Sequence, residues 1–297
     1  MFNIPSICEY CISLGANINA KNVNGKTALH CAADNKCKEI VELLISHGAY
    51  LNIMDKYLKT PLQYAVYHNY KDIVELLISN GANTNEKDKY GENALHYAVY
   101  HNYKDTVELL ISNGANINER DNNGENALHY AARYNYKEMI VFLLLHSAKI
   151  NERDNDGKTA LHYAARHNYK ETIELLLSHG ANINERDNNG EAALHIAARC
   201  SSKETVELLL SHGANINERD NYGKTVLHIA ARYTYKDTVQ LLLSHGANIN
   251  EIDNNGKTAL NSATRCLYKE TTELLLACCK QKFIKSDSSQ FFDICKF

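Results

Sequence analysis

The sequence predicts an all-α repeat protein built of stacked helix–turn–helix units. All 14 glycines fall into two series, in which neighbours such as Gly157 and Gly190 are 33 or 66 residues apart. A residue type confined to fixed intervals indicates an internal repeat. Within each interval, two short segments carry apolar residues at helical spacing. Each segment is shorter than an isolated helix needs to be stable, so neighbouring copies must stack to bury their apolar sides.

The repeat defines the organisation of the chain. Seven full units of 33 residues are expected over residues 22–252. Residues 1–21 match only the second half of a unit and are expected to form an N-terminal cap, and residues 253–280 a shorter, C-terminal capping repeat. Residues 281–297 carry no repeat signal. They are either a disordered tail or a segment that docks its two adjacent phenylalanines onto the last helix.

Each unit begins with a turn and a short first helix. In the turn, Asp154 can accept a hydrogen bond from the backbone two residues on, and Gly157 can adopt a positive φ. The first helix follows in the segment TALHYAAR, where Thr159 is placed to cap its start. Leu161 and Ala165 lie four residues apart, which predicts one narrow apolar side that a neighbouring helix can approach closely.

A second turn and a second helix complete the unit. Asn168 is expected to make a left-handed turn after the first helix. In the segment that follows, Ile173, Leu176 and Leu177 recur at i, i+3 and i+4, which is typical of a buried helix side. Gly180 ends this helix in the left-handed conformation common after a helix.

This pattern resembles the ankyrin repeat. The motif D-x-x-G-x-T-A-L-H-x-A-A, then V/I-x-x-L-L-x-x-G-A-x-I-N, recurs over roughly residues 7–280. The resemblance implies an ankyrin solenoid of stacked helix–turn–helix units with projecting β-hairpin loops. The near-identity of the copies and the leader NIPSICEY also resemble expanded multi-ankyrin-repeat families of parasitic protists. The departures are local: Asn-Tyr replaces the family's Gly-His between helices, and Leu58 replaces a turn glycine.

The histidines are candidates for a metal site or for structural bonds. Six of the 14 follow the leucine at the start of a first helix. By resemblance, this histidine bonds the loop backbone and the nearby threonine hydroxyl, tying adjacent loops together. His162 and His167 lie about 140° apart around a helix, unlike the i, i+4 spacing of two zinc ligands. We therefore expect no metal and no cofactor.

Composition and motifs exclude several classes of function. The chain has 32 basic and 35 acidic residues, so its net charge gives no attraction to nucleic acid or to acidic membranes. It lacks an apolar stretch of about 18 residues, a signal-peptide pattern and the glycine-rich phosphate-binding motifs. Its nine cysteines are expected to be reduced, in a cytoplasmic protein. Cys8 and Cys11 have the spacing of half a redox or zinc motif, but no second pair follows, so a packed cap is favoured.

Partner binding is expected on variable positions rather than on the repeated skeleton. By resemblance, ankyrin repeats bind through their loop tips and through the concave face of the first helices. Two adjacent positions of the first helix carry tyrosine, arginine and histidine, residue types that suit binding hot spots. In the alternative interpretation these arginines only keep the helices hydrated and pair with Glu125 or Glu191. The candidate residues are Tyr67, His68, Tyr100, His101, Arg133, Tyr134, Arg166, His167, Arg199, Arg232 and Tyr233.

These observations favour a protein–protein interaction scaffold without enzymatic activity. We expect a monomer that binds a protein partner, through an acidic or phosphorylated segment of that partner, and neither nucleic acid nor membranes. The alternative is a regulatory, inhibitory or targeting subunit of an enzyme complex, which the sequence does not separate from a scaffold.

Overall fold

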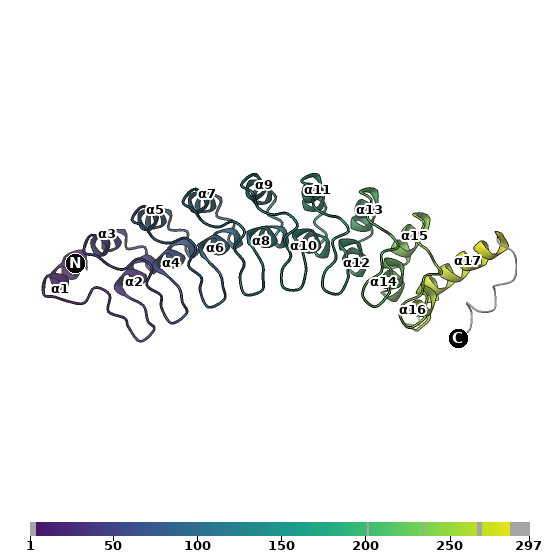
Figure 1. Cartoon of the computed structure of the whole chain (residues 1–297), viewed down its shortest axis with the longest axis horizontal. Helices are drawn as coiled ribbons and strands as arrows, with labels where there is room; N and C mark the ends of the chain where they lie inside the picture. The colour runs from purple at the N-terminus through teal and green to yellow at the C-terminus, as the bar shows by residue number, and fades with distance from the viewer. Residues whose placement is uncertain (1–3, 201, 234, 266–268, 286–297) are drawn as a thin grey trace. The chain divides into compact units, whose positions relative to one another are not determined.

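The chain folds into helices joined by turns (Figure 1). The computed structural model describes residues 4–200, 202–233, 235–265 and 269–285, and no strand occurs among them. They fall into two compact units, Met1–Lys149 and Ile150–Phe297. Each unit is a stack of helix–turn–helix repeats, which confirms the predicted all-α repeat solenoid. The two phenylalanines for which docking was considered lie outside the described residues.

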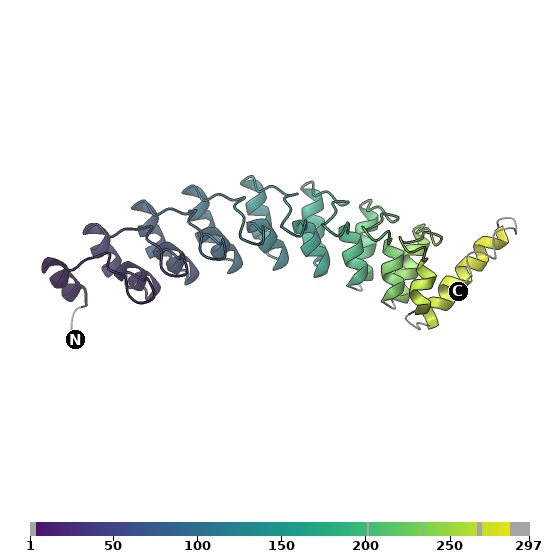
Figure 2. The same cartoon turned by 60° about the horizontal axis from the view of Figure 1, so that its bottom comes forward.

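The first helices are each seven residues long. Within each unit, successive first helices contact one another and lie side by side in both views (Figures 1 and 2). They are α2 (Ala28–Asp34), α4 (Pro61–Tyr67), α6 (Ala94–Tyr100) and α8 (Ala127–Arg133) in the first unit, and α10 (Ala160–Arg166), α12 (Ala193–Arg199), α14 (Val226–Arg232) and α16 (Ala259–Arg265) in the second.

The second helices pack against the first helix of the same repeat. The N-terminal half repeat contributes α1 (Ile4–Ser13), and the last repeat ends in the long helix α17 (Lys269–Lys285). The others are α3 (Lys38–Ser46), α5 (Lys71–Ser79), α7 (Lys104–Ser112), α9 (Lys137–Leu145), α11 (Lys170–Ser178), α13 (Lys203–Ser211) and α15 (Lys236–Ser244).

Small and branched side chains fill the interior between helices. Ala164 and Ala165 of α10 are fully buried, as are Ile173 and Leu176 of α11. Leu177 was expected to be buried in the same way, but it is partly exposed. The apolar positions of the second helix therefore cover more of its circumference than the contact with neighbouring helices does.

The turns adopt the conformations that their residues favour. Asn168 has φ of 61°, in the left-handed region that asparagine tolerates better than most residues. Gly157 has φ of 80°, and a Cβ there would lie 2.7 Å from the backbone nitrogen of Asn188 in the next loop. Leu58, which stands where other repeats have this glycine, also has a positive φ, of 60°. The turn keeps its geometry in spite of the strain that a leucine side chain brings.

The loops contain no strand in the described residues, and neighbouring loops within a unit are hydrogen-bonded to one another. The backbone N–H of Asp154 donates to the carbonyl of Lys158 at 2.9 Å, which closes the loop. In the next repeat, the N–H of Asn188 donates to the carbonyl of Asp156 at 2.8 Å. A further bond recurs in every full repeat: an asparagine Oδ1 accepts the backbone N–H that lies 31 residues later. In the middle of the chain these partners are Asn151 and Asn182, at 2.8 Å.

In most first helices, a histidine near the start joins its own helix to the next loop. In α10, the Nδ1 atom of His162 accepts the backbone N–H of Thr159 at 3.0 Å and lies 2.9 Å from the threonine hydroxyl. Its Nε2 lies 3.1 Å from the carbonyl of Glu191 in the following repeat. Because Nδ1 accepts a hydrogen, the proton of the neutral ring is on Nε2, which donates to that carbonyl. The expected structural role is confirmed by these contacts.

Candidate partner-binding site

The eleven candidate residues share one place in the repeat: each is the last residue of a first helix or the residue directly after it. Since successive first helices contact one another within a unit, equivalent residues form a line, which we call the first-helix row. Its members in the first unit are Tyr67, His68, Tyr100, His101, Arg133 and Tyr134, and its members in the second are Arg166, His167, Arg199, Arg232 and Tyr233.

In the first unit, the tyrosines of the row pack on rings from neighbouring repeats. Tyr67 meets His101 with ring centroids 5.2 Å apart and nearly perpendicular planes, and Tyr100 meets Tyr134 at 5.2 Å. Edge-to-face geometry of this kind is favourable between aromatic rings. The three tyrosines still expose between 37% and 45% of their surface. They form an ordered aromatic surface that a partner can reach.

The histidines of the row make different local contacts. The Nε2 atom of His68 lies 3.0 Å from a carboxylate oxygen of Asp34 in the preceding repeat. Burial lowers the pKa of the His101 ring. His167 is exposed, and its ring stacks on Tyr169 at 5.5 Å. These histidines contribute to the shape of the row, each fixed by a neighbour of its own.

Two arginines of the row are paired with buried glutamates. Arg133 forms an ion pair with Glu125, and Arg199 forms one with Glu191. Each glutamate side chain is only 5% exposed. Each glutamate lies eight residues before its arginine, just before the N-terminus of the same first helix. The ion pairs of the alternative interpretation are therefore present at these two positions, and the charge of both arginines is compensated.

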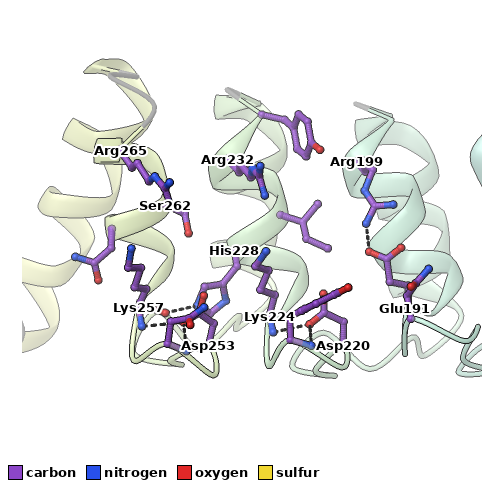
Figure 3. A pocket seen from close by; sticks show the side chains of 16 residues that line it. Glu191, Arg199, Asp220, Lys224, His228, Arg232, Asp253, Lys257, Ser262 and Arg265 are labelled. Atoms are coloured by element: carbon purple, nitrogen blue, oxygen red, sulfur yellow. Dashed lines mark hydrogen bonds and ion pairs between the residues drawn. The ribbon is translucent and has the colours of Figure 1, made fainter.

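Other repeats carry lysine where these two carry glutamate. Lys224 stands eight residues before Arg232, and Lys257 stands eight residues before Arg265. None of these four cations has an ion-pair partner in the part of the chain that the structure describes. Figure 3 shows the contrast: Arg199 turns toward Glu191 along a dashed line, whereas Arg232 and Arg265 do not meet a carboxylate. Positive charge thus accumulates in these two repeats.

A pocket of about 630 Å³ lies among these side chains in the second unit (Figure 3). Its walls come from the loop tips and from the first helices α12, α14 and α16. Ile229 and Ser262 line it at positions where four other repeats carry a tyrosine. Because isoleucine and serine are smaller than tyrosine, space remains between the loops and the helices.

The same replacement changes the chemistry of the loop aspartates. In α6, the hydroxyl of Tyr97 donates to Oδ2 of Asp88 at 2.6 Å, and burial together with this carboxylate raises the tyrosine pKa. Ile229 cannot make the equivalent bond to Asp220. Oδ1 of Asp220 accepts two backbone N–H groups of its own turn, but Oδ2 receives no hydrogen bond from any described residue. This oxygen is left as an acceptor in the pocket wall.

The repeats also match a known family. The family model of ankyrin repeats, which spans three copies, matches residues 1–88, 80–154, 140–220 and 217–287. The chain belongs to the ankyrin-repeat family. Ankyrin repeats are generally protein–protein interaction modules, so the expected partners are proteins. A comparison with curated proteins gives no match.

Sequence reasoning proposed the row of this ankyrin-repeat protein but did not name the lysines that line the pocket beside it. Lys224 and Lys257 were not among the candidate residues, because they lie in the loop and not at the end of a helix. The sequence does contain a signal that could have identified them. The residue eight positions before each of these arginines is glutamate in some repeats and lysine in others. Among the described residues, no cluster of three His, Cys, Asp or Glu side chains suits a metal ion, and no helix is long and apolar enough to cross a membrane.

Proposed function

We propose that this ankyrin-repeat protein is a non-catalytic scaffold that holds a protein partner on its first-helix row and loop tips. One observation carries the proposal: the buried histidines, aspartates and alanines of the repeats take part in the contacts that hold the fold, whereas aromatic and cationic side chains recur, exposed or partly exposed, at the ends of the first helices. Exposed tyrosine and arginine supply contact area and charged hydrogen bonds at little cost to the fold.

The proposed partner presents an acidic or phosphorylated segment to a monomer of this protein. The supporting feature is the uneven charge of the row. Arg166 and Arg232 follow lysines, at positions 158 and 224, where Arg133 and Arg199 follow glutamates. Anionic groups on a partner would therefore gain most from the two arginines without a glutamate.

The test is affinity capture of partners from a native extract. One bait carries Tyr67→Ser and Tyr100→Ser, and another carries Arg166→Glu and Arg232→Glu. The control bait carries Lys170→Glu and Glu174→Lys, exposed changes on the second helix α11. We expect both row variants to lose the partners that the wild-type and control baits recover. Unchanged recovery by both row variants would contradict the proposal. An enzyme recovered at fixed stoichiometry would identify a regulatory or targeting subunit.

A further inference from the structure

The pocket of the second unit has a charge pattern that selects one kind of ligand. Two lysine–arginine pairs face it, Lys224 with Arg232 and Lys257 with Arg265, and none of the four cations has an ion-pair partner among the described residues. At the edge of the pocket, Arg199 is neutralised by Glu191. The pocket therefore offers two concentrations of positive charge, one for each of two successive repeats.

The distance between these pairs is fixed by the packing of the helices. Helices α14 and α16 contact each other, and packed helices lie about 8–10 Å apart. An extended peptide in the polyproline II conformation rises about 3.1 Å per residue with three residues per turn, so side chains three residues apart lie on the same side of the peptide, about 9 Å apart. Two acidic residues with two others between them match the two cation pairs.

The pocket also contains acceptors that suit a peptide better than a polyanion. Oδ2 of Asp220 receives no hydrogen bond from a described residue, and Asp253 lines the wall one repeat later. A peptide can donate backbone N–H groups to such carboxylates while its acidic side chains meet the cations. A nucleic acid backbone carries charge continuously and has no such donors, so these aspartates would repel it.

We propose that this pocket is a binding site for an extended acidic protein segment, with carboxylate side chains at every third residue seated between Lys224–Arg232 and Lys257–Arg265. The guanidinium groups bind the carboxylates as planar forks, and the lysines add charge from the loop side. Ile229 contributes an apolar floor. This inference rests on the proposed scaffold function and gives it a location and a ligand chemistry.

The chain itself supplies the variants for a test. Glu125 and Glu191 show that a glutamate eight residues before an arginine is compatible with the fold and pairs with that arginine. The double variant K224E/K257E copies this arrangement into the pocket and neutralises both arginines. The variant E191K does the reverse and releases Arg199. The control K170E/K203E makes the same change of net charge at exposed residues of the second helices α11 and α13, outside the pocket and the row.

The probe is a fluorescein-labelled peptide with glutamate at every third position, separated by serine and glycine, measured by fluorescence anisotropy with the full chain at physiological salt. We expect K224E/K257E to weaken binding by about tenfold or more, E191K to strengthen it, and K170E/K203E to change it by less than about twofold. Thermal unfolding followed by circular dichroism verifies that each variant is folded.

Three results would overturn the inference: equal binding by K224E/K257E and wild type, equal losses in K224E/K257E and the control, or tighter binding of a duplex DNA of matched charge than of the peptide. These results leave the scaffold proposal standing if the Tyr67→Ser, Tyr100→Ser bait still loses its partners. If both row variants keep their partners while peptide binding still depends on Lys224 and Lys257, the scaffold proposal is refuted and the pocket inference stands.

Discussion

The buried histidine of the first helix is held in its neutral form. Burial lowers the pKa of His162 from 6.5 to about 4 and shifts the pKa values of His30, His96, His195 and His228 in the same direction. The hydrogen bonds agree with this shift. If Nδ1 of His162 were protonated, its N–H would point at the backbone N–H of Thr159, and the hydrogen bond between them would be lost. In the unfolded chain these rings take up protons as the pH falls below about 6.5. The stability they contribute is complete above that pH and is lost between it and the lower, folded-state pKa.

This makes acid stability depend on single side chains. At pH 5, protonation of the unfolded chain at His162 should cost about 2 kcal/mol relative to pH 7.5. In α4, Gln63 replaces the histidine, accepts the N–H of Thr60 at 2.8 Å and donates to the carbonyl of Glu92 at 2.9 Å. The substitution His162→Gln should therefore preserve stability near pH 7.5 and reduce the loss at pH 5. Urea unfolding at both pH values measures this.

The control for this experiment is His179→Gln, at an exposed ring near the end of α11. It should leave the difference between the two pH values as it is in the wild type. If His162→Gln loses as much stability at pH 5 as the wild type does, the buried ring is not the group that titrates.

At the scale of the element, each second helix is held by a narrow line of residues. Leu176 of α11 is fully buried, whereas its neighbour Leu177 is partly exposed. A helix of nine residues is too short to be stable alone, so its position depends on those few buried contacts.

Substitutions at the two leucines should separate these environments. Leu176→Ala removes a buried side chain and leaves a cavity, so it should cost about 2–5 kcal/mol. Leu177→Ala, which removes the same atoms from a partly exposed position, should cost clearly less. Denaturant unfolding of both variants gives the comparison. A cost well below about 1 kcal/mol for Leu176→Ala would contradict the packing described for α11.

At the scale of the whole molecule, stability is a sum over repeats and the contacts between neighbours. Within each unit, successive first helices contact one another and successive loops are hydrogen-bonded to one another. A local defect should therefore remain local. In hydrogen exchange, Leu176→Ala should speed the exchange of backbone amides in α10, α11 and α12, with little change in α2 and α3. Uniform acceleration throughout the chain would show that the repeats unfold as one cooperative unit.

The period of 33 residues was enough to predict the helices and turns. Within that period, the glycines and asparagines mark the turns, and the apolar spacing marks the two helices. The prediction that Leu177 of α11 is buried was wrong, because this residue satisfies the same helical spacing as Leu176 but is only partly covered. Periodicity specifies which residues share a helix side, but not how much of that side a neighbour covers.

The sequence left the charge of the candidate residues open between free arginines and arginines paired with Glu125 or Glu191. The row at the ends of the first helices follows from the repeat, whereas the ion pairs of Arg133 and Arg199 join the end of a helix to its beginning. Such a pair depends on how far a glutamate side chain reaches along the helix, so the residue types alone could name both pairs only as an alternative. The pocket exists because Ile229 and Ser262 are smaller than the tyrosines at the same position in other repeats. The space that this leaves is seen only in the three-dimensional structure.

The asparagine bond between loops bears on how such a chain can change in length. The same Oδ1 acceptor meets the same backbone donor at every junction, as with Asn151 and Asn182 or Asn184 and Asn215. If 33 residues were deleted from or duplicated within the interior, the new junction would join the same two chemical groups. Copy number can then vary by unequal recombination between near-identical units without redesign of any interface, while the lysine or glutamate of each copy adjusts its charge independently.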